Sequence, residues 1–235
     1  MVEEIAGSSP GGNQPAGASL GIGPTAGASR PGTGRAAGAS CRVGVLALQG
    51  DFALHMASLI REGVAPTEAR TAAEIDNLDA LVLPGGESTT MLKLMEKTRI
   101  AQAVRDLHAR GGALFGTCAG LILLARRVTG PEQESLGILD VDVSRNDYGR
   151  QVDSFETDLP WPGSDQPLRG VFIRAPVVTR MGEGVEILVS HQGQPVVVRQ
   201  GSVLGVTFHP ESTHDTRVHR LFLEMTRVAG VGAAG

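Results

Sequence analysis

A cysteine flanked by small residues is the position in this sequence best suited to covalent chemistry. Cys118 lies in GTCAG (116–120), between an apolar run at 113–115 and helix-forming residues at 121–125. A strand, a tight glycine-flanked turn and a helix form a nucleophile elbow, which presents the central side chain on a strained backbone. The pattern predicts that Cys118 is a nucleophile, whereas an isolated cysteine is more often a buried structural residue.

A histidine and a glutamate supply the acid–base groups that such a cysteine requires. His209 and Glu211 lie in FHPE (208–211), at the end of a predicted strand over 203–208. A free thiol titrates at about 8.5, so a cysteine that reacts near neutral pH needs a base to take its proton. A carboxylate then orients the imidazole and stabilises its charged form. A histidine alone would favour a structural role, but together with Cys118 it predicts a Cys-His-Glu triad.

The first half of the chain predicts an α/β fold that brings these residues to one sheet edge. Strands are predicted over 43–48, 64–68, 80–83 and 113–115, and helical segments over 52–62, 72–75, 89–96, 100–110 and 121–125. Apolar strands that alternate with helices indicate a mostly parallel sheet with helices on both faces. The loops 49–51, 84–88 and 116–120 then meet at the carboxyl edge of the strands, where α/β folds bind ligands.

The second half shows a different pattern, in which short strands follow one another without intervening helices. These strands are predicted over 141–145, 154–157, 171–173, 185–190, 196–199 and 203–208. We expect them to add antiparallel strands to the same sheet and to form a small satellite sheet. A closing helix is predicted over 217–228, with Val218, Leu221, Phe222 and Met225 on its inner face.

Composition excludes several classes of protein. Of the 235 residues 41% are hydrophobic and 20% charged, which is ordinary for a globular protein. The net charge of −4 gives no signature of nucleic-acid binding, and no apolar run approaches the roughly 20 residues of a membrane helix. Cys41 and Cys118 lie in different contexts, so we expect both to be reduced in a cytoplasmic protein.

The N-terminal segment differs from the rest of the chain. Residues 1–40 are dominated by Gly, Ala, Ser and Pro and have almost no large apolar side chains. Such a segment cannot bury enough surface to offset its ordering entropy. Glu3 and Glu4 stand where a secretory signal would be basic, which argues against a signal peptide. The sequence predicts a disordered extension over 1–40 and a single domain over 41–230.

The motifs together resemble a known family. GTCAG with a distal HPE is similar to the class I glutamine amidotransferases, and most similar to the branch of glutaminase subunits of pyridoxal phosphate synthase. Further matching stretches are VGVLALQGDFALH (43–55), LVLPGGESTTM (81–91), RNDYGRQVDSFE (145–156) and GVFIRAP (170–176). The resemblance covers about residues 42–228 and implies a flavodoxin-like fold. It leaves the N-terminal segment outside.

The resemblance assigns roles to residues of this chain. It implies Cys118 as nucleophile, His209 as general base and acid, and Glu211 as the orienting group. The residues that match the family's glutamine-binding positions are Gly86, Glu87, Ser88, Arg145, Ile173 and Arg174. Because the amide oxygen becomes an oxyanion, it needs N–H donors, for which we expect Ala119 and one of Gly85 and Gly86. For Arg150, Asp153 and Glu156, structural or interface roles are equally compatible with the sequence.

The implied function is hydrolysis of L-glutamine to glutamate and ammonia. The ammonia would pass to a separate (β/α)8-barrel subunit, within a large hetero-oligomer, that builds pyridoxal 5'-phosphate for vitamin B6 synthesis. One alternative is a glutaminase subunit that serves another synthase, as in histidine or guanine-nucleotide synthesis. Another is a non-catalytic binding homologue on the same fold, against which the intact triad argues.

The remaining histidines predict neither a metal site nor a role in catalysis. Their positions are 55, 108, 191, 214 and 219, and none has the spacing of metal ligands. His214 and His219 flank the start of the closing helix, where we expect solvated side chains. The glycine loops lack a Walker lysine and a dinucleotide fingerprint, so we expect no cofactor.

Overall fold

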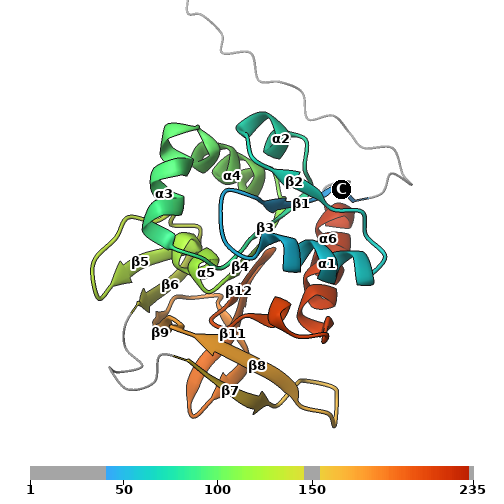
Figure 1. Ribbon diagram of the computed structural model, residues 1–235, viewed down its shortest axis with the longest axis vertical. Helices are drawn as coiled ribbons and strands as arrows, with labels where there is room; N and C mark the ends of the chain where they lie inside the picture. The colour runs from blue at the N-terminus through green and yellow to red at the C-terminus, as the bar shows by residue number, and fades with distance from the viewer. Residues whose placement is uncertain (1–40, 146–153, 233–235) are drawn as a thin grey trace, which may run out of the picture. The chain divides into compact units, whose positions relative to one another are not determined.

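The computed structural model describes residues 41–145 and 154–232, and its centre is a seven-stranded sheet with the strand order β10-β11-β12-β4-β3-β1-β2 (Figure 1). Its parallel strands are β1 (Val43–Leu46), β2 (Thr67–Ala69), β3 (Ala80–Leu83), β4 (Ala113–Thr117) and β12 (Val203–Val206). β11 (Gln194–Gln200) and β10 (Glu186–His191) extend the sheet with antiparallel pairing. This arrangement confirms the predicted fold class.

Helices cover both faces of this sheet (Figure 1). They are α1 (Phe52–Arg61), α2 (Ala72–Asp76), α3 (Ser88–Lys97), α4 (Ile100–Ala109), α5 (Ala119–Leu124) and α6 (Arg217–Gly232). Side chains of a strand alternate between the faces. Leu81 and Leu83 of β3 therefore pack in one core with α2 to α5, while Ala80 and Val82 pack in a second core with α1 and α6. Burial on both faces explains why the strand is apolar throughout.

Two smaller sheets lie beside the central one in the described part of the chain. The first consists of β5 (Ala125–Thr129), β6 (Leu139–Ser144) and β9 (Val177–Met181), with β5 parallel to β6. The second is the antiparallel pair β7 (Ser154–Leu159) and β8 (Leu168–Ile173). The prediction of one satellite sheet was therefore wrong in number, and β5 and β9 were not predicted.

The boundaries also differ in places. The helix predicted to reach residue 125 ends at Leu124, and Ala125 already begins β5 with an extended backbone (ψ 153°) because it pairs with Leu139 of β6. The strand predicted over 64–68 is shifted to Thr67–Ala69. Pro66, just before it, has no N–H to donate to β1.

The predicted extension over 1–40 lies outside the described residues. Residues 146–153, which belong to the motif RNDYGRQVDSFE, also lie outside them. Within the described ranges, no helix has the length and apolar character needed to cross a membrane.

Candidate active site

The backbone at Cys118 has the strained geometry of a nucleophile elbow. The residue joins β4 to α5 with φ 47° and ψ −102°, a backbone region that residues other than glycine rarely adopt. Its N–H donates to the carbonyl of Val206 at 2.9 Å. A Cβ on Gly120 would lie 1.9 Å from the carbonyl oxygen of Leu83, so only glycine lets the helix approach β3 this closely. The flanking glycine is thus required by packing, as the pattern predicted.

His209 reaches Cys118 because their strands are neighbours. β12 runs parallel to β4, with Val206 opposite Thr117, so both chains leave the sheet at the same edge. The N–H of His209 donates to the carbonyl of Val171 in β8 at 2.8 Å, which fixes the backbone at the strand end. Interaction with Cys118 raises the pKa of the His209 imidazole, so the two side chains are neighbours. The structure therefore brings the predicted nucleophile and base together.

Glu211 completes the arrangement from a turn of 3-10 helix over Pro210–Ser212. Its Oε1 lies 2.8 Å from Nδ1 of His209, and both side chains are buried. This leaves Nε2 as the imidazole nitrogen available to the thiol. A carboxylate on Nδ1 and a thiol near the other nitrogen are the contacts that the triad chemistry needs.

The electrostatics of the site favour a charged imidazole. Burial lowers the pKa of His209, but hydrogen bonds and charge from Cys118 and Glu211 outweigh burial and raise that pKa to about 10. Burial raises the pKa of Glu211, but the facing imidazoles of His55 and His209 and the hydrogen bond from His209 outweigh it, so the pKa is lowered. His209 and Glu211 therefore stabilise each other's charged forms.

The glycine loop after β3 lies directly against the imidazole. A Cβ on Gly85 would be 2.4 Å from Cε1 of His209, so the backbone itself forms this wall of the site. Gly86 adopts φ 143°, which L-amino acids with a side chain avoid. These positions place peptide groups beside the triad, where the expected oxyanion donors should be.

Glu87, Ser88 and Arg145, predicted to bind substrate, are joined through polar contacts. The Glu87 carboxylate caps α3 by accepting from the N–H groups of Thr89 and Thr90, and contacts with Thr90 lower its pKa to about 2. Arg145 Nη2 lies 3.5 Å from Glu87 Oε1. Ser88 Oγ donates to Oε1 of Gln133 at 2.9 Å, so its hydroxyl already has a partner.

Ile173 and Arg174 lie at the end of β8. The carbonyl of Ile173 lies 3.9 Å from Sγ of Cys118 and accepts from the thiol. Arg174 follows with φ 44°, and its side chain is exposed with no hydrogen bond or ion pair to any described residue. The structure thus brings the Ile173 backbone to the nucleophile and leaves the Arg174 guanidinium unengaged.

Of the residues with open roles, only Glu156 can be placed. It forms an ion pair with Arg169 at 3.1 Å on the exposed β7–β8 hairpin. Arg150 and Asp153 lie outside the described residues.

Two buried histidines behind Glu211 were missed by the sequence analysis. His219, expected to be solvated, is fully buried, and so is His55. Nδ1 of His55 lies 2.9 Å from Nε2 of His219, and Nε2 of His55 lies 3.1 Å from Oγ1 of Thr117. Each histidine belongs to an apolar helix face, with Leu59 in α1 and Phe222 in α6 one turn away. That placement was the signal available in the sequence.

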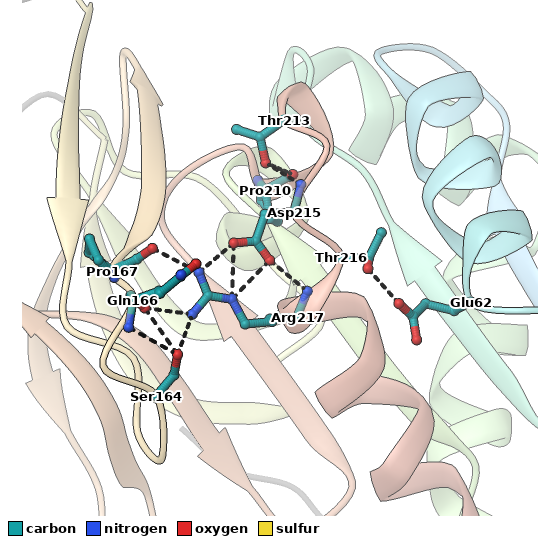
Figure 2. Close-up of polar contacts among 9 residues, drawn as sticks. All are labelled: Glu62, Ser164, Gln166, Pro167, Pro210, Thr213, Asp215, Thr216 and Arg217. Atoms are coloured by element: carbon teal, nitrogen blue, oxygen red, sulfur yellow. Dashed lines mark hydrogen bonds and ion pairs between the residues drawn. The ribbon is translucent and has the colours of Figure 1, made fainter.

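The segment that joins Glu211 to α6 is held on both sides (Figure 2). Arg217 donates to the carbonyls of Gln166 and Pro167, at 2.7 and 2.8 Å, in the turn between β7 and β8. On the other side, Thr216 donates to the carboxylate of Glu62, which follows α1. These ties fix the start of α6, and with it His219, relative to α1.

Asp51 lies close to the triad on the loop after β1. One ligand atom each from Asp51, His209 and Glu211 lie within 4.8 Å of one another, a spacing that a metal ion can fit. His209 and Glu211 already bond each other at 2.8 Å, and this pairing is the one that the predicted triad requires. We therefore assign no metal to this site.

The chain matches a family model and curated relatives over most of its length. A model described as the SNO glutamine amidotransferase family matches residues 45–228. The pyridoxal 5'-phosphate synthase subunit PdxT of Thermus thermophilus is 54% identical over 188 residues, covering 79% of this chain and 98% of the relative. The protein of the same name from Niallia circulans is 48% identical over 188 residues, covering 80% and 99%.

Solved structures show the same likeness. One described as a glutamine amidotransferase is 52% identical, with a TM-score of 0.74 over 78% of this chain and 98% of the other. A putative GMP synthase subunit from Thermoplasma acidophilum has a TM-score of 0.59 over 80% of this chain and 94% of the other. At 15% identity, it supports the fold alone.

Proposed function

This chain belongs to the SNO glutamine amidotransferase family, and from that membership we propose that it hydrolyses L-glutamine and delivers the ammonia to a subunit that makes pyridoxal 5'-phosphate. The 2.8 Å contact of His209 with Glu211, at the end of the strand that runs parallel to the one ending at Cys118, is the observation that carries the proposal. A nucleophile, a base and its orienting carboxylate are the groups that amide hydrolysis through a thioester requires.

The proposed reaction has two halves. The thiolate of Cys118 attacks the side-chain amide carbon of glutamine, and His209 donates its proton to the leaving nitrogen, which departs as ammonia. The glutamyl group remains on Cys118 as a thioester. Water then attacks this thioester while His209 takes a proton from the water, and glutamate leaves as the Cys118 thiolate is restored. Glu211 keeps the imidazole oriented and stabilises its charged form through both halves.

The negative oxygen formed in each half needs N–H donors. We propose that the N–H of Ala119 and that of Gly85 or Gly86 supply them. The backbone of the glycine loop contacts the His209 ring, since a Cβ on Gly85 would clash with it at 2.4 Å. The loop is thus close enough to the reacting carbon to serve.

Recognition of the amino-acid end of glutamine requires positive charge for its carboxylate and acceptors for its ammonium. We propose that Arg145 and Arg174 bind the carboxylate and that Glu87 and Ser88 contribute to binding at the ammonium end, with Gly86 and Ile173 supplying backbone. Arg174 follows Ile173, whose carbonyl contacts Cys118, and its exposed side chain bonds no described residue, which supports this assignment.

The partner follows from the relatives, which are named as subunits of pyridoxal 5'-phosphate synthase. We propose that this chain likewise works with a synthase subunit, that this subunit is a (β/α)8 barrel in a large hetero-oligomer, and that the complex is cytoplasmic. A free glutaminase would waste glutamine, so assembly with the consumer of ammonia has a chemical reason.

The proposal is tested by glutamate release and by complementation. Mixed with the synthase subunit, the chain should release glutamate from glutamine, and it should restore growth of a vitamin B6 auxotroph that lacks its glutaminase subunit. No glutamate release in the mixture would support a non-catalytic homologue. Glutamate release without complementation would assign the chain to a different synthase.

A further inference from the structure

The catalytic carboxylate has two oxygens, and the triad uses one of them. Oε1 of Glu211 bonds His209, whereas Oε2 faces Nε2 of His55 at 3.3 Å. This second contact is an ion-pair distance and not a hydrogen bond, and Oε2 has no hydrogen-bond partner within the described part of the chain. Both side chains are completely buried. An ionised oxygen in such a place needs a donor, and His55 is the group that faces it.

The contacts of His219 and His55 determine which ring nitrogen of each histidine carries the proton. Nδ1 of His219 is buried with no hydrogen-bond partner among the described residues. A proton there would be an unpaired buried donor, so His219 carries its proton on Nε2 and donates to Nδ1 of His55 at 2.9 Å. His55 must then carry its own proton on Nε2. That N–H points to the pair of oxygens formed by Thr117 Oγ1, at 3.1 Å, and Glu211 Oε2.

The opposite pair of tautomers, with the proton on Nδ1 of each ring, is unfavourable at both His219 and His55. With the proton of each ring on Nδ1, His219 would bury an unpaired N–H. At the other end, a bare Nε2 lone pair of His55 would lie 3.3 Å from the carboxylate. Both effects are unfavourable, and they favour the same tautomer independently.

We propose that His55 and His219 are positioning residues for the glutaminase reaction: as neutral Nε2–H tautomers they form a buried chain, His219 to His55 to Glu211, that holds the catalytic carboxylate ionised and aligned. The inference rests on the proposed function for its catalytic meaning. It adds to the triad a support on the carboxylate oxygen that His209 does not use.

The charges around the chain are consistent with neutral rings. Burial lowers the pKa of His55, with the charge of His209 acting in the same direction and those of Glu211 and Asp51 opposing. Burial is also the main cause that lowers the pKa of His219 to about 3; His55 and Arg61 act the same way, while Glu211 and Glu62 oppose. The rings therefore act as dipolar donors.

The helices that carry the two histidines are tied together outside the core. Glu62, at the end of α1, accepts from Thr216 and pairs with Arg220 of α6 at 3.0 Å (Figure 2 shows the Thr216 contact). Phe115 of β4 packs against both imidazoles, with ring centroids 5.9 and 5.6 Å away. His55 and His219 are thus held in register, as a positioning device requires.

The test compares His55→Leu, which removes the donor, with His55→Gln, whose amide N–H reaches a position near that of Nε2. His214→Leu is the control, because His214 is exposed at the same end of α6. In the full chain with ¹³C-labelled glutamate, the carboxyl carbon of Glu211 should titrate at higher pH in His55→Leu than in the wild type. His55→Gln should recover part of that shift, and His214→Leu should show none.

Kinetics with the synthase subunit present give the second readout. For His55→Leu we expect kcat to fall about 10- to 100-fold, because the buried Oε2 of Glu211 loses the N–H that faces it, with KM for glutamine within about twofold. The acid side of the kcat profile should move to higher pH. A purely structural role would lower kcat equally at every pH, and that result would overturn the proposal, as would an unshifted Glu211 titration.

A third measurement needs no variant and no activity. The ¹⁵N ring shifts of His55 and His219 in the wild-type chain should identify both as neutral Nε2–H tautomers at pH 7. A charged ring or an Nδ1–H tautomer at either position would refute the chain even if His55→Leu fails to fold. Because this measurement is independent of glutamine turnover, it also separates failure of this inference from failure of the proposed function.

Discussion

Gln49 and Glu87 join the loop after β1 to the loop after β3: Nε2 of Gln49 donates to the carbonyl of Glu87 at 2.7 Å. The next residue, Gly50, lies so close to the glycine loop that a Cβ there would be 1.9 Å from the carbonyl oxygen of Gly85. The loop after β1 is therefore in direct contact with the glycine loop beside His209.

This contact leads to a prediction about control by the partner. We expect the isolated chain to release glutamate slowly and the synthase subunit to accelerate it, because docking at the first helix would set the orientation of the Gly85–Gly86 peptide. One lost oxyanion donor costs about two to three orders of magnitude in rate. Gly86→Val should abolish the stimulation, and Gln49→Leu should weaken it. Equal initial rates with and without the partner at saturating glutamine would exclude the switch.

Cys118 should be indispensable for ammonia release. Cys118→Ala or Cys118→Ser should reduce glutamate formation to background, because no other group at the site is placed to form the thioester. A glutamine analogue with an electrophilic side chain should label Cys118, as mass mapping of the adduct would show. Cys41→Ser is the matched control and should behave like the wild type. An adduct on Cys41 would reverse the assignment.

Removal of the base should cost more than removal of the group that orients it. His209→Asn leaves no residue to take the thiol proton, so we expect it to be nearly inactive. Glu211→Gln keeps a hydrogen-bonding partner for Nδ1 and should retain some turnover. Steady-state kcat of both variants, measured with the synthase subunit, checks the order. Nearly full turnover in His209→Asn would rule out a triad.

The buried His219 predicts a loss of stability in acid. Burial lowers the pKa of His219 to about 3, whereas an unfolded histidine titrates near 6.5. Between these values the unfolded chain binds a proton that the folded chain does not, so stability rises with pH across this window and is lost as pH falls below about 6.5. The Tm should drop from pH 7 to pH 5, and His219→Leu should make that drop smaller. An unchanged drop would show that other groups cause it.

The N-terminal segment is expected to be dispensable for folding. Deletion of residues 1–40 should leave Tm and glutamate release unchanged, because their composition offers almost no large apolar side chains to pack. Thermal unfolding of the truncated and full chains tests this. A large decrease in Tm on truncation would mean that the segment packs on the domain.

The α/β class and the elbow were predictable because their signals are local. The apolar β3 at Ala80–Leu83 has its predicted bounds. Because both of its faces are buried, all four residues are apolar and the run is easily recognised. The turn at Cys118 was predictable from the glycines beside it, because close packing of α5 on β3 excludes a Cβ at Gly120. The resemblance to the family, which the comparisons confirm, rests on such local motifs.

The tertiary structure alone decided what depends on distant partners. β5 begins at Ala125 because β6 lies beside it, a pairing that the good helix formers of 121–125 do not reveal. His55 and His219 are 164 residues apart in the sequence, and each by itself is only a polar residue on an amphipathic helix. They meet behind Glu211 because α1 and α6 pack on the same face of the parallel sheet. Local propensity determines which helices form and which faces are apolar, whereas the order of the strands decides which buried polar groups become neighbours.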